Sequence, residues 1–454
     1  NKKKLTFNFH HITSSNFTFI DKEFEEKKKI FHDYKSYENF FLKVGIIVNQ
    51  VKRKKIIEKK FDKILTKKNL KIIKNNKLIE EVVNLTDKPY ILECSFDKKF
   101  LNIPKEILVL TMQSHQKYFP LFSKKDEITN EFLVVANNQD KFGLIKAGNE
   151  RVVEARLNDA EFFWNKDISQ NLVKKVSQLK SMNFFRGLGT YFDKVQRMRK
   201  LGSLISDELL ISKEKVELSA SICKTDLISE SVNEFPELQG VMGGHMSNAQ
   251  GFDKDINEAI KEQYLPIGLD SVVPKKPYSI TLSLTDRIDT LTGFFGVNEK
   301  PSSSKDPYAL RRVALGIIRI IVENKKDLKI NDLISYSLNT YLDQGFNFIN
   351  DTLIKDISYF LKDRFRYYLK EKNIRYDIIE AATKALNLNS ISITFEKVKS
   401  LNKVINKSIG EDVVSSYKRA SNILQSELKD INIELTNTTD PGIFKNDYEK
   451  NLYK

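Results

Sequence analysis

The sequence predicts an α+β protein in which α-helices predominate, with mixed α/β structure in residues 1–145 and helices from there onward. Two patterns lead to this fold class. Short aromatic and β-branched runs of period two, typical of strands, occur near the start of the chain. From residue 148 onward, apolar residues recur every three or four positions, which is typical of helices that pack through one face.

A chain of 454 residues is too long for one ordinary hydrophobic core, so we expect several domains. The patterns divide it into an α/β region at 1–145, a helical domain at 146–326 and a further helical part at 327–454. With 41% hydrophobic and 30% charged residues, the composition is that of a soluble globular protein and not of a disordered chain.

The α/β region is predicted from its strand-like runs and one basic helical segment. Strands are expected at residues 7–9, 16–20 and 90–96, and the basic helix is expected at residues 52–65. A short helix follows with Pro104 in its first turn, where the missing N–H of proline costs nothing. Residues 116–122 and 131–137 then predict a β-hairpin with a longer loop.

The segment 148–164 has the clearest helical pattern of the chain. Four apolar residues recur at the spacing of one helix face: Val153, Leu157, Ala160 and Trp164. We assign this face to the core, together with Phe162 and Phe163. Further helices are expected at residues 168–182, 190–210, 213–232, 253–264, 279–295, 307–323, 360–372, 376–386, 391–406 and 412–428.

The helix at 307–323 has a good start signal, with Asp306 as N-cap and Pro307 in the first turn. Its apolar residues lie nearly all round, which predicts a buried helix. Arg312 and Arg319, seven residues apart, share one face, and Arg311 lies beside it. Arginines on a buried helix suit either an ion-pair network or a phosphate contact, and the sequence leaves both open.

The net charge of +15 favours a polyanionic partner such as RNA, although a generally lysine-rich composition explains it equally well. Cys94 and Cys223 are far apart and have no CxxC spacing, which argues against a disulfide scaffold and a cysteine-ligated zinc site. No apolar run is long enough for a transmembrane helix. We therefore expect no membrane partner and a cytoplasmic protein.

The chain has no phosphate-binding glycine motif. The remaining candidates for catalysis resemble a metal-dependent site and lie in the helical domain. Residues 283–288 resemble the segment that supplies the last aspartate, here Asp286, of HD-type metal-dependent phosphohydrolases. Lys224, Thr225 and Asp226 resemble the His-Asp doublet of these enzymes, with Thr225 in place of the histidine.

Threonine removes one metal ligand and Lys224 adds a competing cation. We therefore expect Asp226, His245 and Asp286 to be remnants of such a site, with no catalytic residue and no metal. An active nucleotide phosphohydrolase remains the alternative. It requires stoichiometric bound divalent metal and hydrolysis that is lost in Asp286→Ala.

An ordered set of segments is more specific than any single motif. They lie at residues 115–120, 148–157, 159–163, 224–227, 234–243, 286–291, 293–296, 304–312 and 419–424. In this order they resemble the β subunit of the bacterial tetrameric glycyl-tRNA synthetase. The resemblance is clear from about residue 85 to 325, recognisable to about 430 and weak before 85. It covers less than the family's whole N-terminal region and C-terminal bundle.

The resemblance implies an α₂β₂ glycine–tRNA ligase whose α subunit carries the glycyl-adenylate site and binds ATP and Mg²⁺. This chain then binds no cofactor and contributes tRNA(Gly) binding, through a central HD-like helical domain and a C-terminal anticodon-binding-like bundle. The candidate tRNA contacts are Lys305, Arg311, Arg312, Arg319, Lys418 and Arg419. A third hypothesis, besides the synthetase subunit and the phosphohydrolase, is a stand-alone RNA-binding or scaffold protein of the same fold. A catalytic subunit that is encoded nearby and co-purifies would argue against it.

Overall fold

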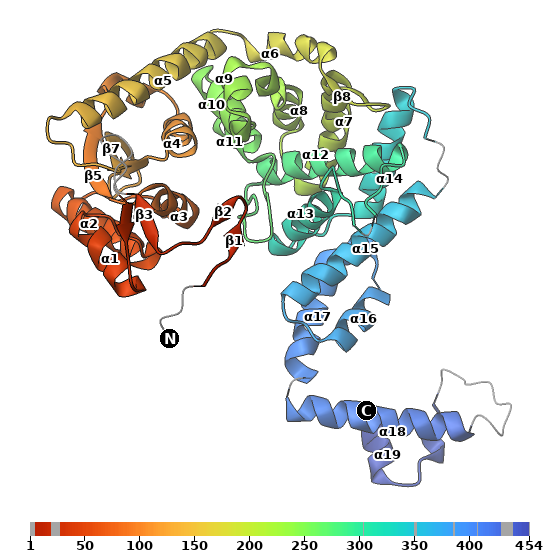
Figure 1. Ribbon diagram of the computed structural model, residues 1–454. Helices are drawn as coiled ribbons and strands as arrows, with labels where there is room; N and C mark the ends of the chain where they lie inside the picture. Colours follow the sequence, from red (N-terminus) through yellow and green to blue (C-terminus); the bar gives the residue numbers. More distant parts are fainter. Residues whose placement is uncertain are drawn as a thin grey trace. The chain divides into compact units, whose positions relative to one another are not determined.

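The computed structural model describes residues 5–19, 28–302, 304–348, 352–384, 386–405, 407–427 and 439–453. It confirms the predominantly helical α+β fold: small antiparallel sheets in the first part of the chain are followed by helices (Figure 1). By its contacts the chain groups into two compact units. The first contains Asn1–Leu265 and Pro274–Asp286, and the second contains Pro266–Val273 and Arg287–Lys454.

This grouping differs from the three predicted domains. One core cluster of the first unit combines residues from both sides of the predicted boundary at 145, for example Phe132 with Leu157 and Met242. The sheet and the first helices after it therefore bury their apolar surface together, a packing that a sequence pattern does not reveal.

The main sheet of the first unit has three antiparallel strands in the order β5-β7-β6. The strands are β5 (Tyr90–Ser95), β6 (Phe119–Phe122) and β7 (Ile128–Ala136). Tyr90 pairs with Ala136 on one side of the central strand, and Phe119 pairs with Leu133 on the other. The predicted β-hairpin is thus confirmed as β6 and β7.

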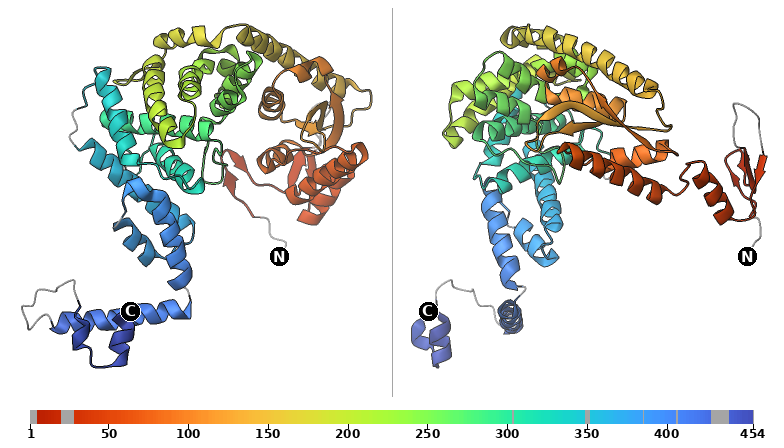
Figure 2. Two further views of the ribbon diagram at one scale, coloured as in Figure 1. Left: turned by 180° about the vertical axis from the view of Figure 1, so that it is seen from behind. Right: turned by 90° about the vertical axis from the view of Figure 1, so that its left-hand side faces the viewer.

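Alternate residues of the sheet enter two separate cores. Leu133 of β7 packs with Phe61 of α2 (Gln50–Lys68) and Val82 of α3 (Asn76–Leu85). Phe132, one residue earlier, faces the other core, which includes Leu157 of α5 (Leu144–Ile168). Figure 2 shows α5 along one face of the sheet and α2 and α3 along the other. Helices therefore cover both faces of the sheet.

Four short strands form two hairpins before the sheet: β1 (Asn8–Phe9), β2 (Ile12–Thr13), β3 (Phe17–Phe19) and β4 (Lys28–Ile30). The remaining helices assigned wholly to the first unit are α1 (Tyr34–Lys43), α4 (Lys105–Leu110), α6 (Leu172–Lys175), α7 (Tyr191–Leu209), α8 (Lys213–Ile222), α9 (Glu230–Glu234), α10 (Val241–Ala249) and α11 (Lys254–Glu262). Helix α12 (Pro277–Gly296) contributes its residues up to Asp286 to this unit and the rest to the second.

The regular secondary structure in the described residues of the second unit consists of helices only, joined by loops. After the end of α12, its helices are α13 (Leu310–Glu323), α14 (Ile330–Asp343), α15 (Leu353–Glu371), α16 (Tyr376–Lys384), α17 (Ile391–Ile405), α18 (Ser408–Glu427) and α19 (Asp447–Tyr453). The predicted burial of the helix at 307–323 is confirmed, because most of α13 from Ala314 to Val322 is inaccessible to solvent.

Three sequence predictions in the helical part were wrong in detail. The predicted helix 168–182 is the short α6 followed by a 3₁₀ segment, and the predicted helix 213–232 breaks after Ile222. A small hairpin of β8 (Asn183–Phe185) and β9 (Gly189–Thr190) interrupts the domain that was expected to be all-helical. Gly187 and Gly189 have φ of +84° and +77° in this hairpin, a conformation that glycine adopts without strain.

The amphipathic pattern of α5 is confirmed by the burial of Val153, Leu157, Ala160 and Trp164. Phe162, which we assigned to the core, is instead 64% exposed. It lies two residues before Trp164, and so on a different face of the helix.

We expect Phe132→Ala to lower the free energy of unfolding by about 3–5 kcal/mol, because the ring is fully buried between the sheet and its helices. Phe142→Ala is the matched control. Its ring is 84% exposed, so the change is expected to stay within about 0.5 kcal/mol. Urea unfolding followed by circular dichroism measures both. Equal losses in the two variants would contradict this description of the core.

Candidate functional site

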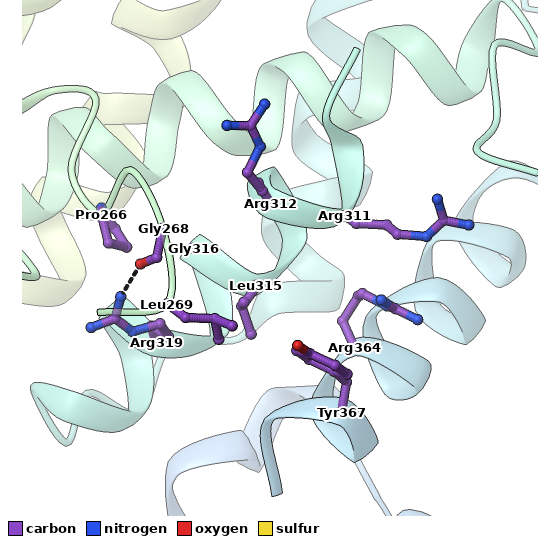
Figure 3. Close-up of a pocket in the computed structure, with 10 residues that line it drawn as sticks. All are labelled: Pro266, Gly268, Leu269, Arg311, Arg312, Leu315, Gly316, Arg319, Arg364 and Tyr367. Carbon is purple, nitrogen blue, oxygen red and sulfur yellow. Dashed lines mark hydrogen bonds between the residues drawn. The ribbon is translucent and has the colours of Figure 1, made fainter. Parts of the chain in front are cut away.

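The second unit contains a surface cavity of about 360 Å³ between α13, α15 and the loop Pro266–Val273. The residues that line it are Pro266, Gly268, Leu269, Arg311, Arg312, Leu315, Gly316, Arg319, Arg364 and Tyr367 (Figure 3). Four are arginines and none is acidic. The lining therefore combines cationic and apolar side chains, which suits an anionic ligand that also has an apolar part.

Two of the arginines that line the cavity, Arg311 and Arg312, lie in the first turn of α13. The predicted N-cap was wrong in position: the helix begins at Leu310, after Ala309 in the left-handed conformation. Asp306 still acts at this end, because its carboxylate accepts hydrogen bonds from the N–H groups of Leu310 at 2.8 Å and Arg311 at 3.0 Å. Proline at 307 and the turn after it precede the helix instead of forming its first turn.

Arg319 has a structural role in the cavity wall. Its guanidinium donates to the backbone carbonyl of Gly268 (Figure 3). It also donates to the carbonyl of Ser271 and pairs with Glu323 at 2.7 Å. The side chain is almost wholly buried. Of the two roles that the sequence left open, Arg319 therefore has the ion-pair role, and it holds the loop Pro266–Val273 against α13.

Arg311 and Arg312 are less constrained. Arg311 is half-buried and donates one hydrogen bond to the carbonyl of Ser302. Arg312 is exposed, and its side chain has no hydrogen bond or ion pair with any other residue that the structure describes. The cationic groups of both residues lie at the rim of the cavity, where a negatively charged ligand can reach them.

The sequence analysis missed Arg364 and Tyr367, which line the cavity from α15. Arg364 pairs with its neighbour Asp363, and its guanidinium lies 5.6 Å from the centre of the Tyr367 ring and 5.9 Å from that of Phe360. Such cation–π contacts hold an arginine head group in place. The sequence did contain one signal: Arg364 and Tyr367 are three residues apart, which places them on one face of a helix. Only the tertiary packing shows that this face of α15 meets α13.

Gly316 makes the close packing at this site possible. A Cβ atom at this position would overlap Nε of Arg287, the residue with which the second unit's part of α12 begins. The other predicted contacts do not line the cavity. Lys305 is exposed before α13, and Lys418 and Arg419 are exposed on α18.

The three predicted remnants of the HD-type site lie in the first unit, and each has partners of its own. Asp286 on α12 accepts ion pairs from Lys224 at 2.9 Å and from Lys194 of α7 at 3.3 Å. Burial opposes the charge of Lys224, but Asp286 and Tyr264 outweigh it and raise the pKa of this lysine well above its usual value. Two buried ammonium groups therefore lie on the carboxylate where a metal-binding enzyme would need a cation site.

Asp226 is completely buried and bound by backbone. One carboxylate oxygen accepts hydrogen bonds from the N–H groups of Gly240, at 2.5 Å, and Gly243, at 3.1 Å. Burial raises the pKa of Asp226 to about 6, opposed chiefly by the hydrogen bond from Gly240. The carboxylate therefore serves to fix the start of α10.

His245 on α10 interacts with Glu106, which also pairs with Lys261. Its Nε2 lies 2.9 Å from a carboxylate oxygen of Glu106, whose other oxygen pairs with Lys261 at 2.8 Å. Burial raises the pKa of Glu106, but the hydrogen bonds from His245 and Lys261 prevail and hold it well below its usual range. Within the described part of the chain, no group of three or more His, Cys, Asp and Glu side chains is arranged to hold a metal.

The fold and this cavity define a basic, mainly helical α+β protein with an arginine-lined cavity, and comparison with known proteins identifies its family. The family model for the glycyl-tRNA synthetase beta subunit matches residues 1–384. The chain belongs to this family. Among the described helices, none is long and apolar enough to cross a membrane.

Individual relatives agree with the family match. The chain is 37% identical over 455 residues to the glycine–tRNA ligase beta subunit of Rickettsia peacockii, and 37% identical over 451 residues to that of Rickettsia africae. The alignments cover 100% and 99% of this chain, respectively, and 65% of each relative. The chain thus spans about two thirds of the length of these relatives.

We expect Asp286→Asn to destabilise the first unit by about 3–5 kcal/mol, because it leaves Lys194 and Lys224 buried without their shared carboxylate. We compare this variant with Lys224→Met, which is expected to lower the free energy of unfolding by less, because Asp286 still pairs with Lys194. Urea unfolding of both variants tests the order. A larger loss in Lys224→Met would show that the two lysines do not share Asp286 in this way.

Proposed function

We propose that this chain is the tRNA-binding subunit of a glycyl-tRNA synthetase. In this proposal a separate α subunit joins glycine to tRNA(Gly) with ATP and Mg²⁺, within an α₂β₂ assembly in the cytoplasm. The family match over residues 1–384 carries the proposal.

The charges of the molecule support a role in RNA binding. Phosphate contacts dominate the affinity of proteins for nucleic acids, and this chain has a net charge of +15. In the second unit Arg311, Arg312 and Arg364 surround one cavity, and among the described residues Arg312 has no acidic partner. An arginine presents a planar set of donors that matches phosphate oxygens, so this rim suits RNA backbone.

The alternative of a metal-dependent phosphohydrolase has weaker support. Asp286 pairs with two lysines, Asp226 accepts backbone hydrogen bonds and His245 pairs with Glu106. Among the described residues, no group of three or more His, Cys, Asp and Glu side chains is arranged to hold a metal. A divalent ion at Asp286 would also have to displace or repel two buried ammonium groups.

Glycylation assays test the proposed role directly. The mixtures are tRNA(Gly), glycine, ATP and Mg²⁺ with neither subunit, this chain alone, the catalytic subunit alone, and both together. We expect charging only with both subunits. Charging by this chain alone would place the active site within it and overturn the proposal. If both together also fail, the same assay with a relative's full-length β chain decides whether the segments beyond this chain are required.

A charge reversal tests the interaction with RNA. We expect Arg311→Glu/Arg312→Glu to weaken tRNA binding and to reduce the slope of log K against log salt by up to about two, because each arginine that binds a phosphate contributes about one to this slope. Lys370→Glu/Lys372→Glu makes the same change of charge at the end of α15, outside the cavity. An unchanged slope, or loss of the folded state, would assign the two arginines to internal packing.

A further inference from the structure

The side chains of the cavity are unevenly distributed. Figure 3 shows Arg311 and Arg364 extending toward the same side of the cavity, from α13 and α15 respectively. In this view Tyr367, which is 37% exposed, lies below Arg364, and the apolar side chains of Leu315 and Leu269 lie to their left. One side of the cavity is therefore cationic, and the other presents an aromatic ring among aliphatic groups.

We propose that this cavity binds a single unpaired nucleotide, with its phosphate between Arg311 and Arg364 and its base against Tyr367. The proposal rests on the proposed function and deepens it, because it assigns to one site the kind of RNA segment that the site takes. It distinguishes a nucleotide-binding cavity from a basic surface that follows the backbone of a duplex.

The two arginines favour an anion between them. Guanidinium groups stay charged at any pH that the folded protein tolerates, so two of them on one side of a cavity repel each other. Asp363 neutralises part of the charge of Arg364, while Arg311 donates to a neutral carbonyl of Ser302. A phosphate replaces the repulsion by two charge-assisted hydrogen bonds.

The floor of the cavity favours a base. An unpaired base is recognised by stacking on an aromatic ring or on the plane of a guanidinium, and here Arg364 and Tyr367 form such a pair. The volume of about 360 Å³ lies within the range of small-ligand cavities. The paired bases of a duplex are stacked on each other and cannot enter a concave site, whereas an unpaired nucleotide can.

Contacts within the protein hold the walls of the cavity. Arg319 ties the loop Pro266–Val273 to α13 through the carbonyls of Gly268 and Ser271, so Leu269 is held opposite Leu315. Arg364 lies over Tyr367 through its cation–π contact. A site that is ordered beforehand loses less conformational entropy when it binds.

A single substitution separates stacking from charge. Tyr367→Leu removes the aromatic face but keeps an apolar side chain, and Tyr367→Phe keeps the face but removes the hydroxyl. The matched control is Tyr359→Leu, because Tyr359 is exposed on the same helix and does not line the cavity. Circular dichroism melting of each full chain checks that the fold is retained.

Binding is measured by fluorescence anisotropy with a short single-stranded oligoadenylate and with a blunt RNA duplex of equal strand length. We expect Tyr367→Leu to weaken binding of the single strand by roughly 5- to 150-fold, the effect of losing one stacked base. Tyr367→Phe and Tyr359→Leu are expected to change it by less than about twofold. Binding of the duplex should be unchanged in all three variants.

Competition identifies the source of the nucleotide. Displacement of the oligoadenylate by AMP, with the same loss in Tyr367→Leu, supports the site with a free nucleotide as its ligand. Displacement by unlabelled single-stranded RNA but not by AMP supports an unpaired segment of RNA. Displacement by a polyglutamate peptide at equal affinity overturns the proposal, because an acidic peptide has charge but no base.

The proposal also fails if Tyr367→Leu and Tyr359→Leu have equal effects, or if single strand and duplex weaken together. Failure of this inference is distinct from failure of the proposed function. Suppose that the chain binds tRNA and supports glycylation, but Tyr367→Leu binds the single strand as tightly as the unchanged chain. The proposed tRNA-binding function is then supported and the nucleotide site is ruled out. If the chain binds no tRNA, the proposed function itself is lost.

Discussion

The cavity of the second unit depends on the guanidinium of Arg319. This side chain is buried, and it donates to two carbonyls of the loop Pro266–Val273 while it pairs with Glu323 one turn further along α13. Each bond satisfies a polar group that would otherwise lose its water. Without Arg319, the loop would lose these two bonds to α13 and keep the hydrogen bond from Arg287 to the carbonyl of Pro266. A lysine cannot replace it, since one ammonium group lacks the forked geometry that reaches all three partners.

The first unit uses buried charge differently. Asp286 holds Lys194 of α7 and Lys224 after α8, and Asp226 accepts two backbone N–H groups at the start of α10. Both carboxylates therefore connect helices that the apolar core also joins. Buried charges of this kind add little net stability over apolar residues, but the removal of one partner is costly. Asp226 and Asp286, which the sequence analysis compared with a metal site, thus act as internal cross-links.

The sequence predicted what depends on local pattern. The buried helix α13 and the shared face of Arg312 and Arg319 followed from the spacing of apolar and charged residues, and so did the buried face of α5. It did not predict that Arg319 is tied to a loop while Arg312 is exposed, because that difference arises from the segment Pro266–Val273, which meets α13 only in the folded chain.

The missed residues of the cavity have the same explanation. Arg364 and Tyr367 come from α15, which begins 30 residues after the end of α13, and no local pattern indicates which face of α15 meets it. Phe162 shows the opposite error, since hydrophobicity alone assigned an exposed ring to the core. Phe132 and Leu157, which lie on the two sides of the predicted boundary at 145, share one core, and a sequence pattern does not reveal such packing.

The order of the strands in the main sheet has a consequence for synthesis on the ribosome. The central strand β7 is the last of the three to be made, and about 40 residues separate the end of β5 from the end of β7. At 5–20 residues per second, β5 waits roughly 2 to 8 s for its partner. During this interval its backbone N–H and C=O groups and its apolar side chains are exposed. The nascent chain therefore passes through a stage in which β5 can pair wrongly or bind a chaperone before the sheet closes.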